Sequence, residues 1–208
     1  MSLKVLITAS LLYFSYFSNA QFTLRLNSGT NYNYWKRTNH AVLDPKGQFD
    51  GFFSIIPGFR TSKKLNTNYE LQFTRQSLKF SGLYDGLNPV PDLKVTGNYL
   101  RFLPTFEITL FSDLDLFFGP EMSFLISENT KKGSVRFEAT SKPFFADLTI
   151  GLGSGIKYSF RRLFVSGRYS HTISKETTFK FPDNQGNQIE DLLNKSRNFQ
   201  IGIGYRLI

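Results

Sequence analysis

NFQIGIGYRL, residues 198–207, is the stretch that decides the fold class. Apolar side chains stand at every second position, and the positions between them carry polar residues or glycine. A period of two predicts a β-strand with one apolar and one polar face. The apolar face holds Phe199, Ile201, Ile203, Tyr205 and Leu207, and the other face holds Asn198, Gln200, Gly202, Gly204 and Arg206.

Seven further segments repeat this alternation, so the sequence predicts eight strands and an all-β fold. They cover residues 22–27, 53–60, 69–74, 100–110, 114–126, 148–160 and 163–170. In the third of them the apolar residues change parity near Arg75, because Leu78 and Phe80 fall out of phase with Tyr69. We therefore expect a β-bulge near Arg75.

The predicted connections alternate between short and long. The short ones lie at residues 61–67, 111–113 and 160–162, and the long ones at 35–50, 81–95, 127–142 and 174–196. Even numbers of strands with this alternation are typical of outer-membrane barrels, which have tight periplasmic turns and long extracellular loops. We expect an eight-stranded antiparallel transmembrane β-barrel with both termini on the periplasmic side, and a short helix at Gln188–Leu193 in the last loop.

A soluble β-sandwich or a lipocalin-like barrel is the alternative, and the two strand faces argue against it. The apolar face is long and nearly free of polar residues, whereas the polar face is rich in glycine and carries charges of both signs. Such a polar face suits a narrow packed lumen. The aromatic content of 16% also fits, because aromatic residues gather at membrane interfaces. The residues predicted at the interfaces are Tyr32, Tyr34, Trp35, Phe80, Tyr158 and Phe160.

Five short motifs follow one another in the second half of the chain. They are NYLRFLP at 98–104, FGP at 118–120, GLGSG at 151–155, GRYS at 167–170 and GIGYRL at 202–207. In this order they resemble the strand motifs of PorT-like outer-membrane β-barrel proteins, over about residues 95–208. The resemblance implies a barrel in a Gram-negative outer membrane and suggests, as one role, an accessory component of a protein-export machine.

Residues 1–20 are predicted to be a signal peptide and residues 21–208 the barrel domain. Lys4 precedes an apolar run from Val5 to Phe17, and Ser18 and Ala20 place small residues at positions −3 and −1 of a cleavage site. The run is too short to span a bilayer comfortably. We therefore expect an exported protein.

Composition and charge exclude several classes of protein. The chain has no cysteine, which excludes disulfide scaffolds, thiol enzymes and zinc–thiolate sites. Its mean hydropathy of −0.24 excludes a bundle of membrane-spanning helices. The net charge of +9 comes from basic residues that are scattered along the sequence, so we expect no nucleic-acid partner. No phosphate-binding loop or metal-ligand spacing stands out. Asp113 and Asp115 could face one way at a strand start and bind Ca²⁺, but they are interpreted as turn acids, so neither a cofactor nor a metal is expected.

An eight-stranded barrel is too narrow for a water channel, because side chains fill it. The protein is therefore not predicted to be a porin. Charges of both signs on the polar face must pair inside the lumen, since an unpaired buried charge is costly. The predicted lumen charges are Arg25, Arg60, Arg101, Glu107, Asp115, Glu121, Lys157, Arg168 and Arg206.

An enzyme is the alternative from another class, because some small barrels are lipid A-modifying hydrolases with a lipid-facing serine–histidine pair. His171 falls on the lipid side at the outer end of a strand, near Ser170, Ser174 and Glu176. The spacing to Ser174 does not place both side chains on one strand face, so we expect no catalytic residues and no enzyme. His40 is interpreted as a solvated loop residue.

The long loops are then the remaining functional surface. We expect a monomeric outer-membrane protein with a structural or loop-mediated binding role. Its partners would be outer-membrane lipids, whose phosphates Lys131 and Lys132 could contact, and a protein bound through the loops.

Overall fold

The computed structural model describes the strands and most of the turns of the chain. The described residues are 21–35, 45–60, 62, 64–80, 83–85, 88–90, 92–132, 135–137, 148–174, 179–182, 188–191 and 196–208. The predicted signal peptide at residues 1–20 lies outside them.

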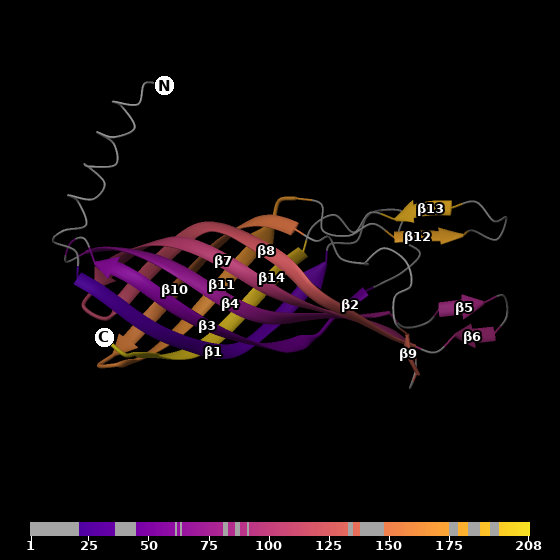
Figure 1. Cartoon of the computed structure of the whole chain (residues 1–208), viewed down its shortest axis with the longest axis horizontal. Helices are drawn as coiled ribbons and strands as arrows, with labels where there is room; N and C mark the ends of the chain where they lie inside the picture. Colours follow the sequence, from indigo (N-terminus) through magenta and orange to yellow (C-terminus); the bar gives the residue numbers. More distant parts are fainter. Residues whose placement is uncertain are drawn as a thin grey trace, which may run out of the picture.

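Eight strands close into an antiparallel barrel, as predicted (Figure 1). They are β1 (Gln21–Trp35), β3 (Phe49–Arg60), β4 (Leu65–Phe80), β7 (Leu93–Phe111), β8 (Leu114–Lys132), β10 (Leu148–Phe160), β11 (Leu163–Thr172) and β14 (Ser196–Arg206). Around the barrel the order is β1, β3, β4, β7, β8, β10, β11 and β14, and β14 pairs with β1. Closure leaves no unpaired sheet edge, which is what a membrane-spanning sheet requires.

Six shorter strands lie beyond the barrel at one of its ends (Figure 1). β2 (Pro45–Gly47) pairs with β4, and β9 (Val135–Phe137) pairs with β8. Two hairpins stand apart, one formed by β5 (Leu83–Asp85) and β6 (Asn88–Val90) and one by β12 (Phe179–Pro182) and β13 (Gln188–Asp191). Residues Gln188–Asp191 are therefore a strand, and the helix predicted there is wrong.

The opposite end carries the short connections. β3 leads to β4 through residues 61–64, β7 to β8 through Ser112 and Asp113, and β10 to β11 through Arg161 and Arg162, where Arg161 has a φ of 55°. β1 begins and β14 ends at this same end, where Arg25 pairs with Arg206. Since short turns mark the periplasmic end of outer-membrane barrels, the start of β1 and the end of β14 both lie on that side, as predicted for the barrel domain.

The two faces of every barrel strand are as the alternation predicts. The outer face is an apolar belt of half-exposed side chains, among them Phe53, Phe73, Leu100, Phe124 and Ile201. The inner face holds the polar residues. Tyr34, Tyr158 and Phe160 are exposed near strand ends, as expected of interfacial residues. In the described part of the chain, no helix is long and apolar enough to cross a membrane.

Two predicted details of β4 are wrong. The register of β4 against β7 runs without a shift from the Leu65–Ile108 pair to the Phe80–Leu93 pair, so β4 itself has no bulge near Arg75. On its other side the extra residue belongs to the neighbouring strand, between the Gly47–Leu78 and Phe52–Thr74 pairs. Leu78 and Phe80 keep the inward parity and are 0% and 1% exposed, so Phe80 is not an interfacial residue. The inward side chains of β4 thus become apolar at Leu78 and Phe80 while the strand keeps the same orientation. The reason is that β4 continues past the membrane, where its inner side is covered by protein.

One bulge lies on β8. Tyr99 pairs with Leu125 and Asn98 with Ser127, which leaves Ile126 as an extra residue. Beyond it β8 continues to Lys132, so the third long connection begins after Lys132 rather than at residue 127. β4, β7 and β8 thus reach 16, 19 and 19 residues, whereas about 10 tilted residues suffice to cross a bilayer. Their extra length forms a sheet on the extracellular side (Figure 1), which we call the extracellular extension (Arg75–Phe80, Leu93–Tyr99 and Ile126–Lys132, with β2 and β9 paired at its two edges).

Candidate functional site

The barrel lumen gathers four basic and four acidic side chains, and all eight are at most 10% exposed. The basic ones are Arg25, Arg101, Lys157 and Arg168, and the acidic ones are Glu70, Glu107, Asp115 and Glu121. Their formal charges cancel. These eight side chains therefore contribute nothing to the net charge of +9.

Glu107 is the centre of the periplasmic half of the lumen. Arg25 Nη1 lies 3.0 Å from its Oε2, and Lys157 Nζ lies 2.7 Å from its Oε1. Asn66 and Asn68 donate to the same carboxylate over 2.8 and 3.2 Å. Lys157 also contacts Asp115 Oδ2 at 3.1 Å. One carboxylate thus holds side chains from β1, β4 and β10 against β7.

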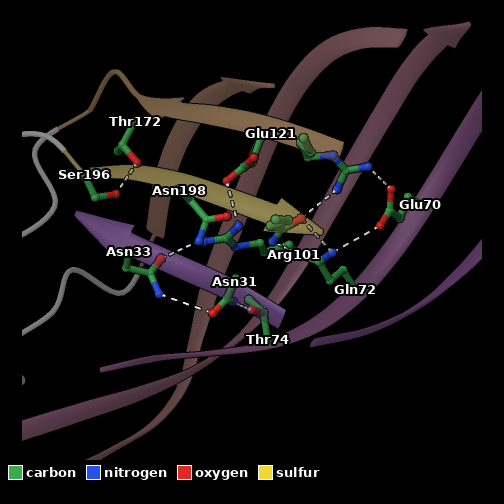
Figure 2. Close-up of polar contacts among 12 residues, drawn as sticks. Asn31, Asn33, Glu70, Gln72, Thr74, Arg101, Glu121, Thr172, Ser196 and Asn198 are labelled. Atoms are coloured by element: carbon green, nitrogen blue, oxygen red, sulfur yellow. Dashed lines mark hydrogen bonds and ion pairs between the residues drawn. The ribbon is translucent and has the colours of Figure 1, made fainter. Parts of the chain in front are cut away.

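A further ion pair joins Glu70 of β4 to Arg168 of β11, and Figure 2 shows Glu70 beside Gln72. Gln72 donates to Glu70 over 3.2 Å and exchanges hydrogen bonds of 3.3 and 3.0 Å with Gln200. Arg168 donates in turn to Gln200 Oε1 over 3.4 Å. The two amides bridge β4 and β14, which lie apart in the strand order, so the network crosses the lumen.

The extracellular half of the lumen depends more on amides and hydroxyls. Arg101 Nη1 lies 3.4 Å from Glu121 Oε1. Above this pair, hydrogen bonds join Asn198 to Asn33 and Asn33 to Asn31, and Asn31 donates to Thr74 over 2.5 Å (Figure 2). These side chains fill the lumen up to its extracellular end, where β1 ends and β14 begins.

Phenylalanine rings fill the remaining space, each against a glycine. A methyl group on Gly155 would lie 2.4 Å from the ring of Phe117, and one on Gly204 would lie 2.0 Å from the ring of Phe164. The two rings are the register partners of these glycines. Lys157 Nζ lies 5.8 Å from the centre of the Phe164 ring, so the ring also faces a cation. The inward glycines of the packed lumen therefore receive phenyl rings.

Seven of the nine predicted lumen charges are confirmed as buried members of the network. The prediction that Arg60 and Arg206 are buried in the lumen is wrong, because Arg60 is exposed and Arg206 is half-buried at the periplasmic mouth. They line a cavity of about 210 Å³ there, together with Asp113 and Arg161. Glu70 was missed, although its position on the polar parity of its strand was a signal that could have found it. The inward rings of Phe52, Phe117 and Phe164 were missed because each stands beside or within an apolar run.

The histidine–serine arrangement of a hydrolase does not form among the described residues. His171 lies on the outer face, whereas its neighbour Ser170 is buried on the lumen side. Ser174 Oγ accepts a hydrogen bond of 2.8 Å from the backbone N–H of Ile150. His171 Nδ1 has no hydrogen-bond partner among the residues that the structure describes. His40 and Glu176 lie outside the described residues.

Asp113 and Asp115 have separate partners rather than a shared site. Asp113 is exposed in the turn and accepts a hydrogen bond of 3.1 Å from Ser112, while Asp115 accepts one of 2.7 Å from Thr109 inside the barrel. Within the described ranges, no group of three His, Asp or Glu residues could hold a metal ion.

No protein-family model matches the chain, and no curated protein matches it. Solved structures of outer-membrane barrels do match. A major outer membrane protein of Thermus thermophilus has a TM-score of 0.50 at 12% identity, over 89% of this chain and 99% of that chain. Neisserial surface protein A matches with a TM-score of 0.49 and 12% identity, over 90% of this chain and 99% of that chain. OprG from Pseudomonas aeruginosa matches with a TM-score of 0.49 and 11% identity, over 90% of this chain and 97% of that chain. The closed barrel and its apolar belt are those of an outer-membrane protein, and the chain is located in that membrane.

Proposed function

We propose that the protein is a non-conducting, non-enzymatic, monomeric barrel of the outer membrane that presents a binding surface on its extracellular side. The packed lumen is the observation that carries the proposal. The larger cavity of about 210 Å³ lies at the periplasmic mouth, whereas the two cavities beside Arg25 measure only about 40 and 30 Å³. Each of these two has room for no more than a few water molecules. A lumen filled in this way supports a structural role for the ion pairs rather than a path for solutes.

The extracellular extension supports the binding role. Its inner face carries four fully buried apolar side chains, namely Leu78, Phe80, Val95 and Tyr99. A sheet with an apolar core of its own keeps a fixed shape without the membrane around it. The barrel can thus serve as a rigid base that holds this sheet above the membrane surface.

Single-channel conductance in planar bilayers tests the closed lumen. We expect no conductance steps from the folded wild-type chain. As a matched control we would replace Arg25, Glu107, Lys157 and Asp115 with serine, which removes two charges of each sign and much of the packed volume. This variant should produce steps, provided that its heat-dependent gel migration shows a folded barrel.

Conductance steps from the wild type would contradict the proposal. If neither chain conducts and the serine variant is folded, the remaining side chains also close the lumen, which supports the proposal further. The His171→Ala variant would be assayed on lipid A beside the wild type, and deacylation that is lost with His171 would contradict the non-enzymatic role.

A further inference from the structure

One row of the extracellular extension consists of basic residues alone. Lys46 of β2 pairs with Lys79 of β4, Lys79 with Lys94 of β7, and Lys94 with Lys131 of β8. Arg136 of β9 holds the next register position, opposite Lys131. Directly paired residues share one face of an antiparallel sheet. We call Lys46, Lys79, Lys94 and Lys131 the lysine row.

The lysine row lies on the outer face of the extension. Lys79 and Lys94 each stand six residues from the belt residues Phe73 and Leu100, so they share the face of that belt. Lys131 stands seven residues from Phe124, and the extra residue of the β8 bulge at Ile126 corrects its parity. Without that bulge Lys131 would point inward. The bulge therefore completes the row.

The positive charge of the row is mostly uncompensated. Like charges directly opposite one another destabilise a sheet. Asp92 lies 2.7 Å from Lys79 Nζ. Among the residues that the structure describes, Lys46, Lys94 and Lys131 form no ion pair, and all three are exposed. A sheet that places directly paired lysines on neighbouring strands, whose backbones lie about 5 Å apart, is suited to an external ligand with several anionic groups.

The height of the row above the membrane indicates which ligand this is. Between the belt and the row lies a polar row in which Arg75 donates to Asn98 over 3.2 Å and Asn98 donates to Ser127 over 2.9 Å. Six residues of strand correspond to about 20 Å along the strand and, at a tilt near 40°, to about 15 Å above the apolar belt. At this height the row faces sideways, toward the headgroups and sugars of neighbouring lipids, rather than outward from the cell.

We propose that the lysine row binds the phosphate groups on the saccharide of an outer-leaflet glycolipid that stands beside the barrel. The inference rests on the proposed function in one respect, since it names a ligand for the extracellular surface. It does not depend on whether the lumen conducts. A failure in the conductance experiment and a failure in the binding experiment below are therefore distinguishable.

The test measures binding of the full folded chain in nanodiscs to two probes. One is bacterial lipopolysaccharide with a phosphorylated inner core, and the other is the same lipid after removal of its core phosphates. We expect the wild type to bind the phosphorylated probe at least tenfold more tightly. The difference should shrink as salt is raised, because exposed charges are screened.

The row variant carries Lys46→Gln, Lys79→Gln, Lys94→Gln and Lys131→Gln. Its matched control carries Arg60→Gln, Lys64→Gln, Arg161→Gln and Arg162→Gln, which remove the same charge from the periplasmic end. We expect the row variant to lose at least tenfold in affinity and the control to stay within twofold of the wild type.

A second variant guards against failure of the row variant to fold. Lys94→Glu places a carboxylate between Lys79 and Lys131, so it should keep or raise the stability of the extension while weakening lipid binding. Full affinity in both row variants would overturn the proposal, as would an equal loss in the periplasmic control. Tighter binding of a soluble sulfated polysaccharide than of the phosphorylated lipid would overturn it in favour of a soluble polyanion.

Discussion

Glu107 separates two cations that the barrel brings into one space. Arg25 and Lys157 both contact its carboxylate, and the side chains of all three are about 5% exposed. Replacing Glu107 with Gln keeps the shape of the side chain but leaves a net charge of +1 in the lumen. Breaking a buried ion pair by removing one partner costs about 3–5 kcal/mol. We expect Glu107→Gln to lower the free energy of unfolding by about this amount, measured by guanidinium unfolding in detergent micelles.

A double variant separates charge balance from lost packing. Adding Arg25→Gln to Glu107→Gln returns the lumen to zero net charge and leaves the contact between Lys157 and Asp115 intact. The double variant should therefore be more stable than Glu107→Gln alone. If the free energy of unfolding of the double variant instead falls by the sum of the two single losses, then the individual hydrogen bonds determine stability and the balance of charge does not.

Gly204 is a position where the lumen has no room for a methyl group. An added Cβ would lie 2.0 Å from the ring of Phe164 and 2.5 Å from the backbone oxygen of Leu26. Overpacking of this kind costs about 1–3 kcal/mol. Gly204→Ala should lower the unfolding midpoint accordingly. Gly167→Ala is the matched control, since its Cβ would meet only Ile156 at 3.9 Å, and equal effects of the two substitutions would contradict this account.

The alternation of residues predicts the face of nearly every strand position, but it does not predict which residue lies opposite each inward side chain. Phe117 and Phe118 are neighbours of equal hydrophobicity, and one faces a glycine while the other faces lipid. Only the strand register shows that Gly155 lies opposite Phe117. This register is determined by the pairing of strands that are far apart in the sequence, so a local sequence pattern does not predict it.

At the scale of the element, β4 contains both a membrane strand and a soluble strand. Its inward residues are polar up to Gln76 and apolar at Leu78 and Phe80, and this change of chemistry without a change of face was interpreted from the sequence as a bulge. The two parts obey opposite rules. A membrane barrel has its apolar side outward, whereas a sheet in water buries that side. The change in polarity therefore marks where β4 leaves the membrane.

Leu78 and Lys79 test this division because they are adjacent and face opposite sides. Leu78→Ala creates a cavity in the core of the extension and should cost about 2–5 kcal/mol there, while Lys79→Ala removes only a half-exposed side chain. We expect faster amide hydrogen exchange at Val95 and Tyr99 in Leu78→Ala and unchanged exchange in Lys79→Ala. The membrane strands should exchange slowly in both. Faster exchange throughout β7 in Leu78→Ala would mean that the extension and the barrel unfold as one unit.

At the scale of the whole molecule, charge is distributed by compartment. The lumen is neutral, and the outer face of the extension carries the lysine row. The sequence shows only scattered lysines, because Lys46, Lys79, Lys94 and Lys131 are far apart along the chain. Strand pairing and one bulge place them side by side. A basic stripe therefore exists on the surface although the sequence shows none.

The orientation of the barrel can be tested on intact cells, because the chain has no cysteine of its own. Single variants Lys94→Cys and Lys131→Cys place a thiol on the extracellular extension, and Ser112→Cys places one in the exposed turn between β7 and β8. If the short turns are periplasmic, a membrane-impermeant maleimide should label Lys94→Cys and Lys131→Cys on intact cells. It should label Ser112→Cys only after the outer membrane is permeabilised. Labelling of Ser112→Cys alone on intact cells would mean that the lysine row faces the periplasm, where no outer-leaflet glycolipid could reach it.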